Sequence, residues 1–218
     1  MEKVILSQQI GMKVSTARFA NVAFSDGSLL FGFEHRLNKQ QPLAIPTDIR
    51  RFFVTKEEAG QLCLLSCLAA EDKEIFFPKT GKKFQDKSLV EIASKYLEAK
   101  GFMPAPFDDE KIARQSVVKC SSEGKWPCYY FESDTTGEKP FEEFYSEQER
   151  VSFDQFESIG VVKFDAGEEN IDYECFLKLY RKFKKSDNWK KSELVNIFKI
   201  FLPNFLHEEK NKSLDQKM

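Results

Sequence analysis

The stretch Arg18-Phe-Ala-Asn-Val-Ala-Phe-Ser-Asp-Gly-Ser28 determines the expected fold, because it joins the end of a buried strand to the start of a helix. Residues 14 to 22 form a largely apolar run, which predicts a strand covered on both faces. Ser25-Asp-Gly-Ser28 is a turn sequence, and Ser28 can cap a helix that extends to about Asn38. A buried strand followed directly by a helix indicates a parallel α/β sheet.

The same alternation of strand and helix continues outward to about residue 80. Thr55-Lys-Glu-Glu58 is a capping box that predicts a helix to about Ala70, and the segment from Glu74 to Pro78 predicts the next strand. A second capping box, Ser88-Leu-Val-Glu91, predicts a helix that Gly101 ends. One strand–helix–strand piece is too small for a complete doubly wound sheet. Residues 1–84 are therefore expected to be the closing portion of such a sheet.

Residues 85–218 are expected to form a second, mixed α+β domain with helices at its C-terminal end. Pro104 and Pro106 interrupt the pattern after Gly101. Beyond them the sequence predicts helices over 108–115, 170–185 and 189–202 and strands over 126–132 and 158–164. The expected fold class is therefore α/β, with a mixed second domain.

The composition is that of an ordinary globular protein and argues against several classes of partner. A net charge of −2 gives no global field to attract nucleic acid or an anionic membrane. The apolar runs are far shorter than the ~20 residues of a membrane-spanning helix, and no signal peptide is visible. Five cysteines without repeated spacing favour reduced thiols in the cytoplasm, and two distant histidines, His35 and His207, argue against a zinc site. The basic run from Arg181 to Lys191 is a candidate nucleic-acid surface, but basic helix faces are more often simply solvated. Neither nucleic acid, membrane nor metal is expected as a partner.

Generic catalytic motifs are missing from the sequence. It contains no Gly-x-Ser-x-Gly, His-Glu-x-x-His, Cys-x-x-Cys or Gly-x-Gly-x-x-Gly segment. A Tyr-x-x-x-Lys spacing, in which the lysine lowers the pKa of a proton-shuttling tyrosine, occurs at Tyr96–Lys100 and at Tyr180–Lys184. Both pairs fall on amphipathic helices, where residues four apart are ordinary neighbours. No catalytic residue is assigned from these patterns.

Four segments, taken in order, resemble one family. Arg18 to Ser28 is similar to the Arg-Phe-Gly-Asn-Val-x-x-Ser-x-Gly-Ser segment of UDP-N-acetylglucosamine 4,6-dehydratases, which are extended short-chain dehydrogenase/reductases of polysaccharide biosynthesis. Thr47-Asp-Ile-Arg-Arg-Phe-Phe-Val-Thr55 resembles the family's Thr-Arg-Phe-Phe-x-Thr segment, and Glu74-Ile-Phe-Phe-Pro78 resembles the strand that follows. Gly137-Glu-Lys139 with Glu142-Glu143 is similar to the Pro-Gly-Glu-Lys-x-x-Glu-Glu segment near the substrate. The resemblance covers residues 1 to about 165. It implies that residues 1–84 are the remainder of a Rossmann-type NAD(P)-binding domain, and that residues 85–218 are a substrate-binding domain with a helical extension.

The resemblance also implies a UDP-sugar as ligand and NADP or NAD as the cofactor of the intact enzyme. Asn21, Leu29 and Thr47 match positions that contact the substrate, and Gly137, Glu138 and Lys139 match the segment beside it. The turn beside the nicotinamide is matched by Val22, Ala23, Phe24, Ser25 and Asp26. The residue types by themselves leave a plainer interpretation open. Asn21 and Thr47 are also typical of turns and caps, and residues 137–139 are typical of a charged surface turn.

Departures from the family pattern limit the expected activity. The family usually has an arginine two residues before the glycine of the Gly-Glu-Lys segment. Here that position is Thr135, and Arg50 or Arg51 is a candidate substitute for the lost charge-assisted contact. In the family the glycine-rich loop and the catalytic Tyr-x-x-x-Lys precede the strand at residues 14–22. The chain is therefore expected to be inactive alone, as a truncation, a split form or the product of a mis-called start. The expected protein partner is a separately encoded N-terminal half or another copy in a homo-oligomer. The alternative is a non-catalytic remnant or interaction protein.

Overall fold

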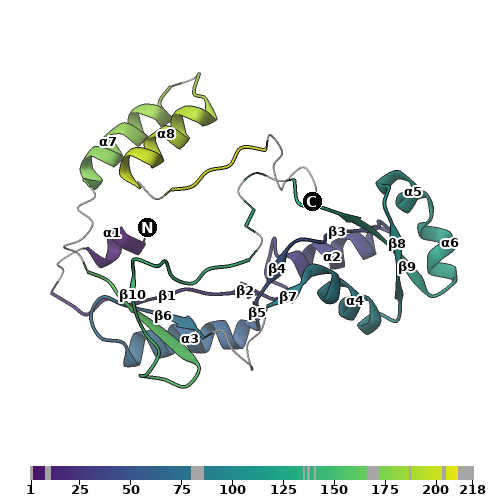
Figure 1. Ribbon diagram of the computed structural model, residues 1–218, viewed down its shortest axis with the longest axis horizontal. Helices are drawn as coiled ribbons and strands as arrows, with labels where there is room; N and C mark the ends of the chain where they lie inside the picture. Colours follow the sequence, from purple (N-terminus) through teal and green to yellow (C-terminus); the bar gives the residue numbers. More distant parts are fainter. Residues whose placement is uncertain are drawn as a thin grey trace.

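The computed structural model describes residues 2–7, 11–79, 86–134, 136, 138–139, 141–165, 172–186, 188–202 and 205–210. The fold is mixed α/β, and its two larger sheets lie toward opposite ends of an elongated molecule (Figure 1). We call these ends the four-stranded lobe, which contains β1, β6, β10, β11, α1 and α3, and the three-stranded lobe, which contains β3, β8, β9, α2, α4, α5 and α6.

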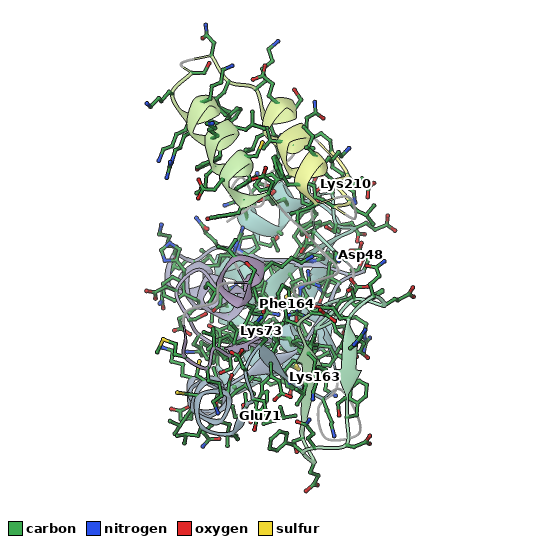
Figure 2. All side chains as sticks on the ribbon, turned by 90° about the vertical axis from the view of Figure 1, so that its left-hand side faces the viewer. Asp48, Glu71, Lys73, Lys163, Phe164 and Lys210 are labelled. Atoms are coloured by element: carbon green, nitrogen blue, oxygen red, sulfur yellow. The ribbon has the colours of Figure 1, made fainter. Side chains whose placement is uncertain are left out.

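The four-stranded lobe has the strand order β1-β6-β11-β10. Its elements are α1 (Glu2–Leu6), β1 (Thr16–Ala17), α3 (Lys56–Ala69), β6 (Glu74–Pro78), β10 (Arg150–Ser152) and β11 (Ile159–Lys163). Strand β1 is parallel to β6, whereas β11 is antiparallel to both β6 and β10. The apolar run predicted at 74–78 is buried at the centre of this sheet, where Phe76 and Phe77 are at most 1% exposed. Just past the β6–β11 ladder the N–H of Phe164 donates to the carbonyl of Lys73 at 2.9 Å (Figure 2).

The three-stranded lobe has the strand order β3-β9-β8, and both pairs are parallel. Its elements are α2 (Leu29–Asn38), β3 (Leu43–Pro46), α4 (Leu89–Ala99), β8 (Met103–Phe107), α5 (Glu110–Gln115), α6 (Val117–Ser122) and β9 (Lys125–Phe131). Leu43, Ile45, Leu97 and Cys128 are fully buried in its core. Because helices supply residues to this core, the short parallel strands are covered as such sheets require.

The helices predicted from local signals are present with the expected caps. The Ser28 hydroxyl accepts the N–H of Phe31 at the start of α2. Reciprocal capping boxes begin α3 at Thr55 and α4 at Ser88. Gly101, with φ of 84°, follows the end of α4. These ends form where expected because each cap satisfies backbone groups that the helix itself leaves unpaired.

The strand predicted over 14–22 is divided into β1 and β2 (Asn21–Val22). The N–H of Arg18 donates to Phe76 of β6, but the N–H of Asn21 donates to Phe52 instead, and β2 pairs in parallel with β5 (Phe53–Val54). The backbone therefore changes its pairing partner between residues 18 and 21, which interrupts the ladder. The run is also less buried than expected, because among residues 14–22 only Ala20 is buried and Phe19 is 42% exposed. The sequence carries no information about the change of partner that causes this.

The segment with Pro104 and Pro106, expected to break the pattern, forms strand β8. This strand lies at the edge of its sheet, next to β9. The two prolines are two residues apart, so their nitrogens point the same way, and the alternate residues 103, 105 and 107 can bond to β9. Proline is tolerated in an edge strand for this reason.

The sheets cross the boundary expected at residue 84. Strand β3 pairs with β9, and β6 pairs with β11, so each lobe takes strands from both sides of it. An antiparallel ladder between β4 (Arg50–Arg51) and β7 (Lys87–Ser88) adds a further link. Beyond the lobes, α7 (Tyr173–Lys184) and α8 (Lys191–Phe201) form a pair of helices.

Candidate functional site

A cavity of about 1000 Å³ is lined by residues of both lobes. The four-stranded lobe contributes Arg18 after β1, and the three-stranded lobe contributes the first turns of α2 and part of β3. Residues 138–139 and 141–144 form another part of the wall. The apolar lining includes the rings of Phe19, Phe53, Phe131 and Phe141. Pockets of this size, mostly apolar with a few polar groups, are typical small-molecule sites.

Asn21, in β2, is held in one orientation inside this cavity. Its Nδ2 donates to the carbonyl of Phe52 at 3.2 Å and to Oε1 of Glu142 at 2.8 Å. Both partners are acceptors, so the side-chain nitrogen must face them and both of its N–H groups are used. The amide oxygen is the group that remains to accept a hydrogen bond from a ligand.

Glu142 is the most unusual carboxyl group of the cavity. Its Oε2 atom is buried and has no hydrogen-bond partner among the described residues. Burial raises the pKa of Glu142, and the positive charge of Arg51 and the hydrogen bonds from the Phe52 backbone and the Asn21 side chain oppose that rise only in part. A buried oxygen without a partner normally costs stability, which makes this atom a candidate contact for a ligand donor.

Arg51 connects β4 to the segment with Glu138 and Lys139. Its guanidinium donates to the backbone carbonyl of Lys139 at 2.9 Å and lies 3.7 Å from a carboxylate oxygen of Glu138. Glu138 also accepts a hydrogen bond from the hydroxyl of Ser133 at 2.6 Å. Arg50, the other candidate substitute for the family arginine, pairs with Asp86 and does not line the cavity. Arg51 is thus the arginine of the pair that reaches the site.

Arg18 forms ion pairs and a hydrogen bond that hold residues 144–149 in place beside the cavity. Its guanidinium forms ion pairs with Glu2 at 2.7 Å and Glu149 at 2.5 Å, and it donates to the carbonyl of Phe144 at 2.7 Å. Burial lowers the pKa of Arg18, but the hydrogen bonds to Glu149 and Glu2 outweigh burial and raise it above the ordinary value. Arg18 therefore stays charged and joins α1, β1 and the 141–149 segment.

The N-terminal end of α2 faces the cavity through Gly27, Ser28 and Leu29. Gly27 has φ of 73°, a conformation that other residues rarely adopt, so it permits the turn before the helix. The first turn of α2 contains no acidic residue. The partial positive charge of the helix end is therefore available to an anion in the cavity.

The structure brings together part of the predicted site. Asn21, Leu29, Glu138 and Lys139 all line the cavity, although the two pairs are more than 100 residues apart in sequence. Thr47 does not line it, and the Thr47 hydroxyl donates to the carbonyl of Phe131. Gly137 and Thr135 lie outside the described residues. Arg51, one of the two candidate substitutes for the family arginine, lines the cavity. Arg18 and Glu142 also line it without having been predicted as site residues, although both belong to the quoted segments.

The predicted cofactor segment from Val22 to Asp26 follows β2 and does not line this cavity. It offers the hydroxyl of Ser25, which donates to the Val22 carbonyl, and the carboxylate of Asp26, but no cation. With no glycine-rich loop in the sequence, these residues do not fit a dinucleotide by themselves.

The contacts of Tyr96, the tyrosine of the first Tyr-x-x-x-Lys pair, indicate a structural role and not a catalytic one. Its hydroxyl donates to Glu34 at 2.7 Å, and Lys100 pairs with the same carboxylate at 2.7 Å. Burial and the Glu34 hydrogen bond raise the pKa of Tyr96. A proton-shuttling tyrosine needs a lowered pKa, so this Tyr-x-x-x-Lys pair has the opposite electrostatic character.

Comparisons with known proteins identify the family. A 30% identical relative is the uncharacterized membrane protein MJ1061 of Methanocaldococcus jannaschii, matched over 68% of this chain and 39% of that protein. Across the described part of this chain, no helix is long and apolar enough to span a membrane. The X-ray structure of Pen from Bacillus thuringiensis is similar in fold, with a TM-score of 0.54 and 17% identity over 90% of this chain and 54% of that one. The chain thus spans about two fifths of the first protein and about half of the second. The family model of polysaccharide biosynthesis proteins matches residues 1–163, three quarters of the sequence, and the chain therefore belongs to the polysaccharide biosynthesis protein family.

Proposed function

We propose that this chain is the nucleotide-sugar-binding part of an NAD(P)-dependent 4,6-dehydratase or epimerase acting on a UDP-N-acetylglucosamine-like substrate. Family membership supports a role in polysaccharide biosynthesis. The observation that carries the finer proposal is that Asn21, Leu29, Glu138 and Lys139 line one cavity. They come from two of the segments that resemble the dehydratases, and a chance sequence likeness gives no reason for them to meet.

The chemistry of the cavity suits a nucleotide sugar. Arg51 and the N-terminal end of α2 provide positive charge for a diphosphate, and Lys139, which pairs with Glu143 at 2.7 Å, would add to it by exchanging that carboxylate for a phosphate. The amide oxygen of Asn21 can accept a sugar hydroxyl or N-acetyl N–H, and the phenylalanine rings offer flat apolar surface to a base. In the intact family the bound nicotinamide cofactor supplies the hydride chemistry. The role assigned to this chain is to bind and orient the sugar nucleotide.

We also propose a division of labour along the chain. Residues 1–84 correspond to the closing part of a Rossmann-type domain, and residues 85–218 to the substrate domain with its helical extension, with β9 and β11 of the second part completing sheets begun by the first. The turn at 22–26 would border the cofactor once the glycine-rich half is present, as part of a longer chain or as a separate protein. On its own the chain is expected to bind substrate without converting it.

Thermal unfolding with separate ligands tests the proposal. Saturating UDP-N-acetylglucosamine or UDP is expected to raise the Tm, by an amount that grows with ligand concentration, whereas NADP is not. Asn21→Ala and the cavity-filling Leu29→Trp should abolish the shift. Asn196→Ala and Leu64→Trp, on exposed helix surfaces, are the matched controls and should retain it. A shift that survives Leu29→Trp would refute binding in this cavity.

A second candidate function is an interaction protein that pairs with a separate N-terminal half. It is favoured by the position of β1 at the end of its sheet, where one side of the strand is unpaired within that sheet. In that case none of the small ligands would change the Tm of this chain. Mixing the chain with the separately expressed glycine-rich half of a relative would raise it.

A further inference from the structure

Helices α7 and α8, together with the residues between them, form a unit that we call the C-terminal hairpin. Its helices run antiparallel, since Phe176 near the start of α7 contacts Phe201 at the end of α8, and Phe183 contacts Trp189. The pair stands apart from both sheets (Figures 1 and 2). It also lies beyond residue 163, where the family match ends.

The apolar side chains of the hairpin are not buried. Neither helix contains a buried residue. Trp189 is 55% exposed and Ile200 is 67% exposed. In α7 the aromatic residues 173, 176, 180 and 183 fall on one helix face, as the spacing of an amphipathic helix requires. Part of this face packs on α8, where Phe176 contacts Phe198 and Phe201. The large apolar side chains of the hairpin that remain exposed are Leu179, Tyr180, Trp189 and Ile200.

The charge of the hairpin differs from that of the rest of the chain. Residues 178–191 contain seven basic residues and one acidic residue. This stretch therefore carries +6, and because the whole chain carries −2, the remaining residues carry −8. Lys178, Arg181, Lys182 and Lys185 follow the spacing i, i+3, i+4, i+7 and form one exposed helix face. Among ion pairs between described residues, Lys191 has Glu209 as its partner, and these four cations have none.

We propose that the C-terminal hairpin binds the surface of an anionic membrane. A helical hairpin that carries both exposed apolar side chains, among them Trp189 and Ile200, and a Lys/Arg-rich helix face matches the boundary between lipid headgroups and acyl chains. Nucleic acid would satisfy the cations but would leave Leu179 and Ile200 in water. The net negative charge of the remaining residues is repelled by the same surface, so the membrane contact is directed to the hairpin. The net charge of −2 for the whole chain conceals the basic hairpin, because it is the sum of two regions of opposite sign.

Co-sedimentation of the full chain with vesicles tests the proposal. We expect binding to vesicles of phosphatidylglycerol and phosphatidylcholine, little binding to phosphatidylcholine alone, and weakening as salt increases. Arg181→Gln, Lys182→Gln and Lys185→Gln together should weaken binding about a hundredfold, at about fivefold per cation. All three side chains are exposed, so folding should be unaffected. A triple Lys→Gln variant at the exposed residues 56, 111 and 119 is the matched control and should bind as the wild type does.

Tryptophan emission gives an independent readout of the same contact. Trp126 is 5% exposed and Trp189 is 55% exposed, so a blue shift on adding anionic vesicles should come from Trp189 and disappear in Trp189→Phe. A shift that persists in that variant would overturn the proposal. So would tighter binding to duplex DNA or RNA than to anionic vesicles at equal salt, or a hairpin-dependent dimer that conceals Trp189 without lipid.

Discussion

Gly160 occupies a position in β11 where a single added methyl group should destabilise the protein. It lies opposite Phe77 in β6, and a Cβ built at Gly160 would be 2.6 and 2.8 Å from the two Cε atoms of the Phe77 ring and closer still to Cζ. Ordinary carbon contacts are about 3.5–4.0 Å, so the ring would have to retreat by about 1 Å. Phe77 is 1% exposed, and its ring contacts the rings of Phe144, Tyr145 and Phe153. The ring therefore cannot move away from Gly160 without displacing these neighbours.

The expected size of the effect follows from two opposing contributions. Overpacking a well-filled core costs about 1–3 kcal/mol. Replacing a strand glycine by alanine returns about 0.5–1 kcal/mol, because the unfolded chain loses freedom. The built Cβ comes within 3.0 Å of three ring atoms, so the overpacking cost lies in the upper half of its range, about 2–3 kcal/mol. Gly160→Ala should therefore lower the free energy of unfolding by about 1–2.5 kcal/mol, which at about 2 kcal/mol per molar urea is a midpoint lower by about 0.5–1.2 M.

Urea unfolding monitored by circular dichroism measures this change. Gly60→Ala, in α3, is the control, because its Cβ would meet nothing within 4 Å and the substitution should stabilise. Combining Gly160→Ala with Phe77→Leu should cost less than the sum of the two single changes, since the smaller side chain relieves the overlap. A wild-type midpoint for Gly160→Ala, or strict additivity of the pair, would refute the argument. Because Phe144 stacks on Phe77 and lines the cavity, Gly160→Ala should also reduce the Tm shift given by UDP.

Three further outcomes are expected. The pKa of Glu149 is lowered, because its hydrogen bonds from Arg18 and Ser146 outweigh burial, so its contribution to stability is present above the ordinary glutamate pKa and lost as pH falls. Glu149→Gln should destabilise at pH 7 but not at pH 3 in paired thermal melts, and an equal loss at both would contradict this. Glu142 has a raised pKa, so the sign reverses: its ionisation costs stability, and Glu142→Gln should gain stability relative to wild type as pH rises from 4 to 7. A gain that does not change with pH would point to packing instead. Thr55→Ala removes one half of the α3 capping box and should cost about 1 kcal/mol in urea unfolding, whereas Thr55→Ser should retain most of the stability.

Local signals in the sequence predicted the helices but not the pairing of the strands. The caps at Ser28, Thr55 and Ser88 act within four residues, so sequence alone could locate α2, α3 and α4. The division of the strand at 14–22 depends on Phe52 and Phe76, which are distant in sequence. Strand β8 was missed because its prolines are acceptable only at the edge of a sheet, and sequence does not say which strand is at the edge.

The candidate site also depends on contacts between residues that are distant in sequence, which local patterns do not predict. Resemblance to a family pointed to Asn21, Leu29 and the 137–139 segment, but residue spacing could not show that they share a cavity. The side chains that connect them, Arg18, Arg51 and Glu142, are of two common residue types, arginine and glutamate, and their role depends on long-range partners. Arg18 acts through Glu149, 131 residues away, and Asn21 through Glu142, 121 residues away. No local period records contacts of that range.

The interleaving of the lobes has a consequence for synthesis on the ribosome. Strand β6 ends at Pro78, yet its antiparallel partner β11 ends only at Lys163, and β3 likewise waits for β9. At 5–20 residues per second, the first 80 residues spend about 4–17 s with apolar strands that lack their partners. Neither sheet can therefore close while the nascent chain is half made. During this interval the unpaired strands are most exposed to aggregation. Co-expressed chaperones or a lower growth temperature should therefore raise the yield of soluble protein more than stabilising substitutions in the finished fold.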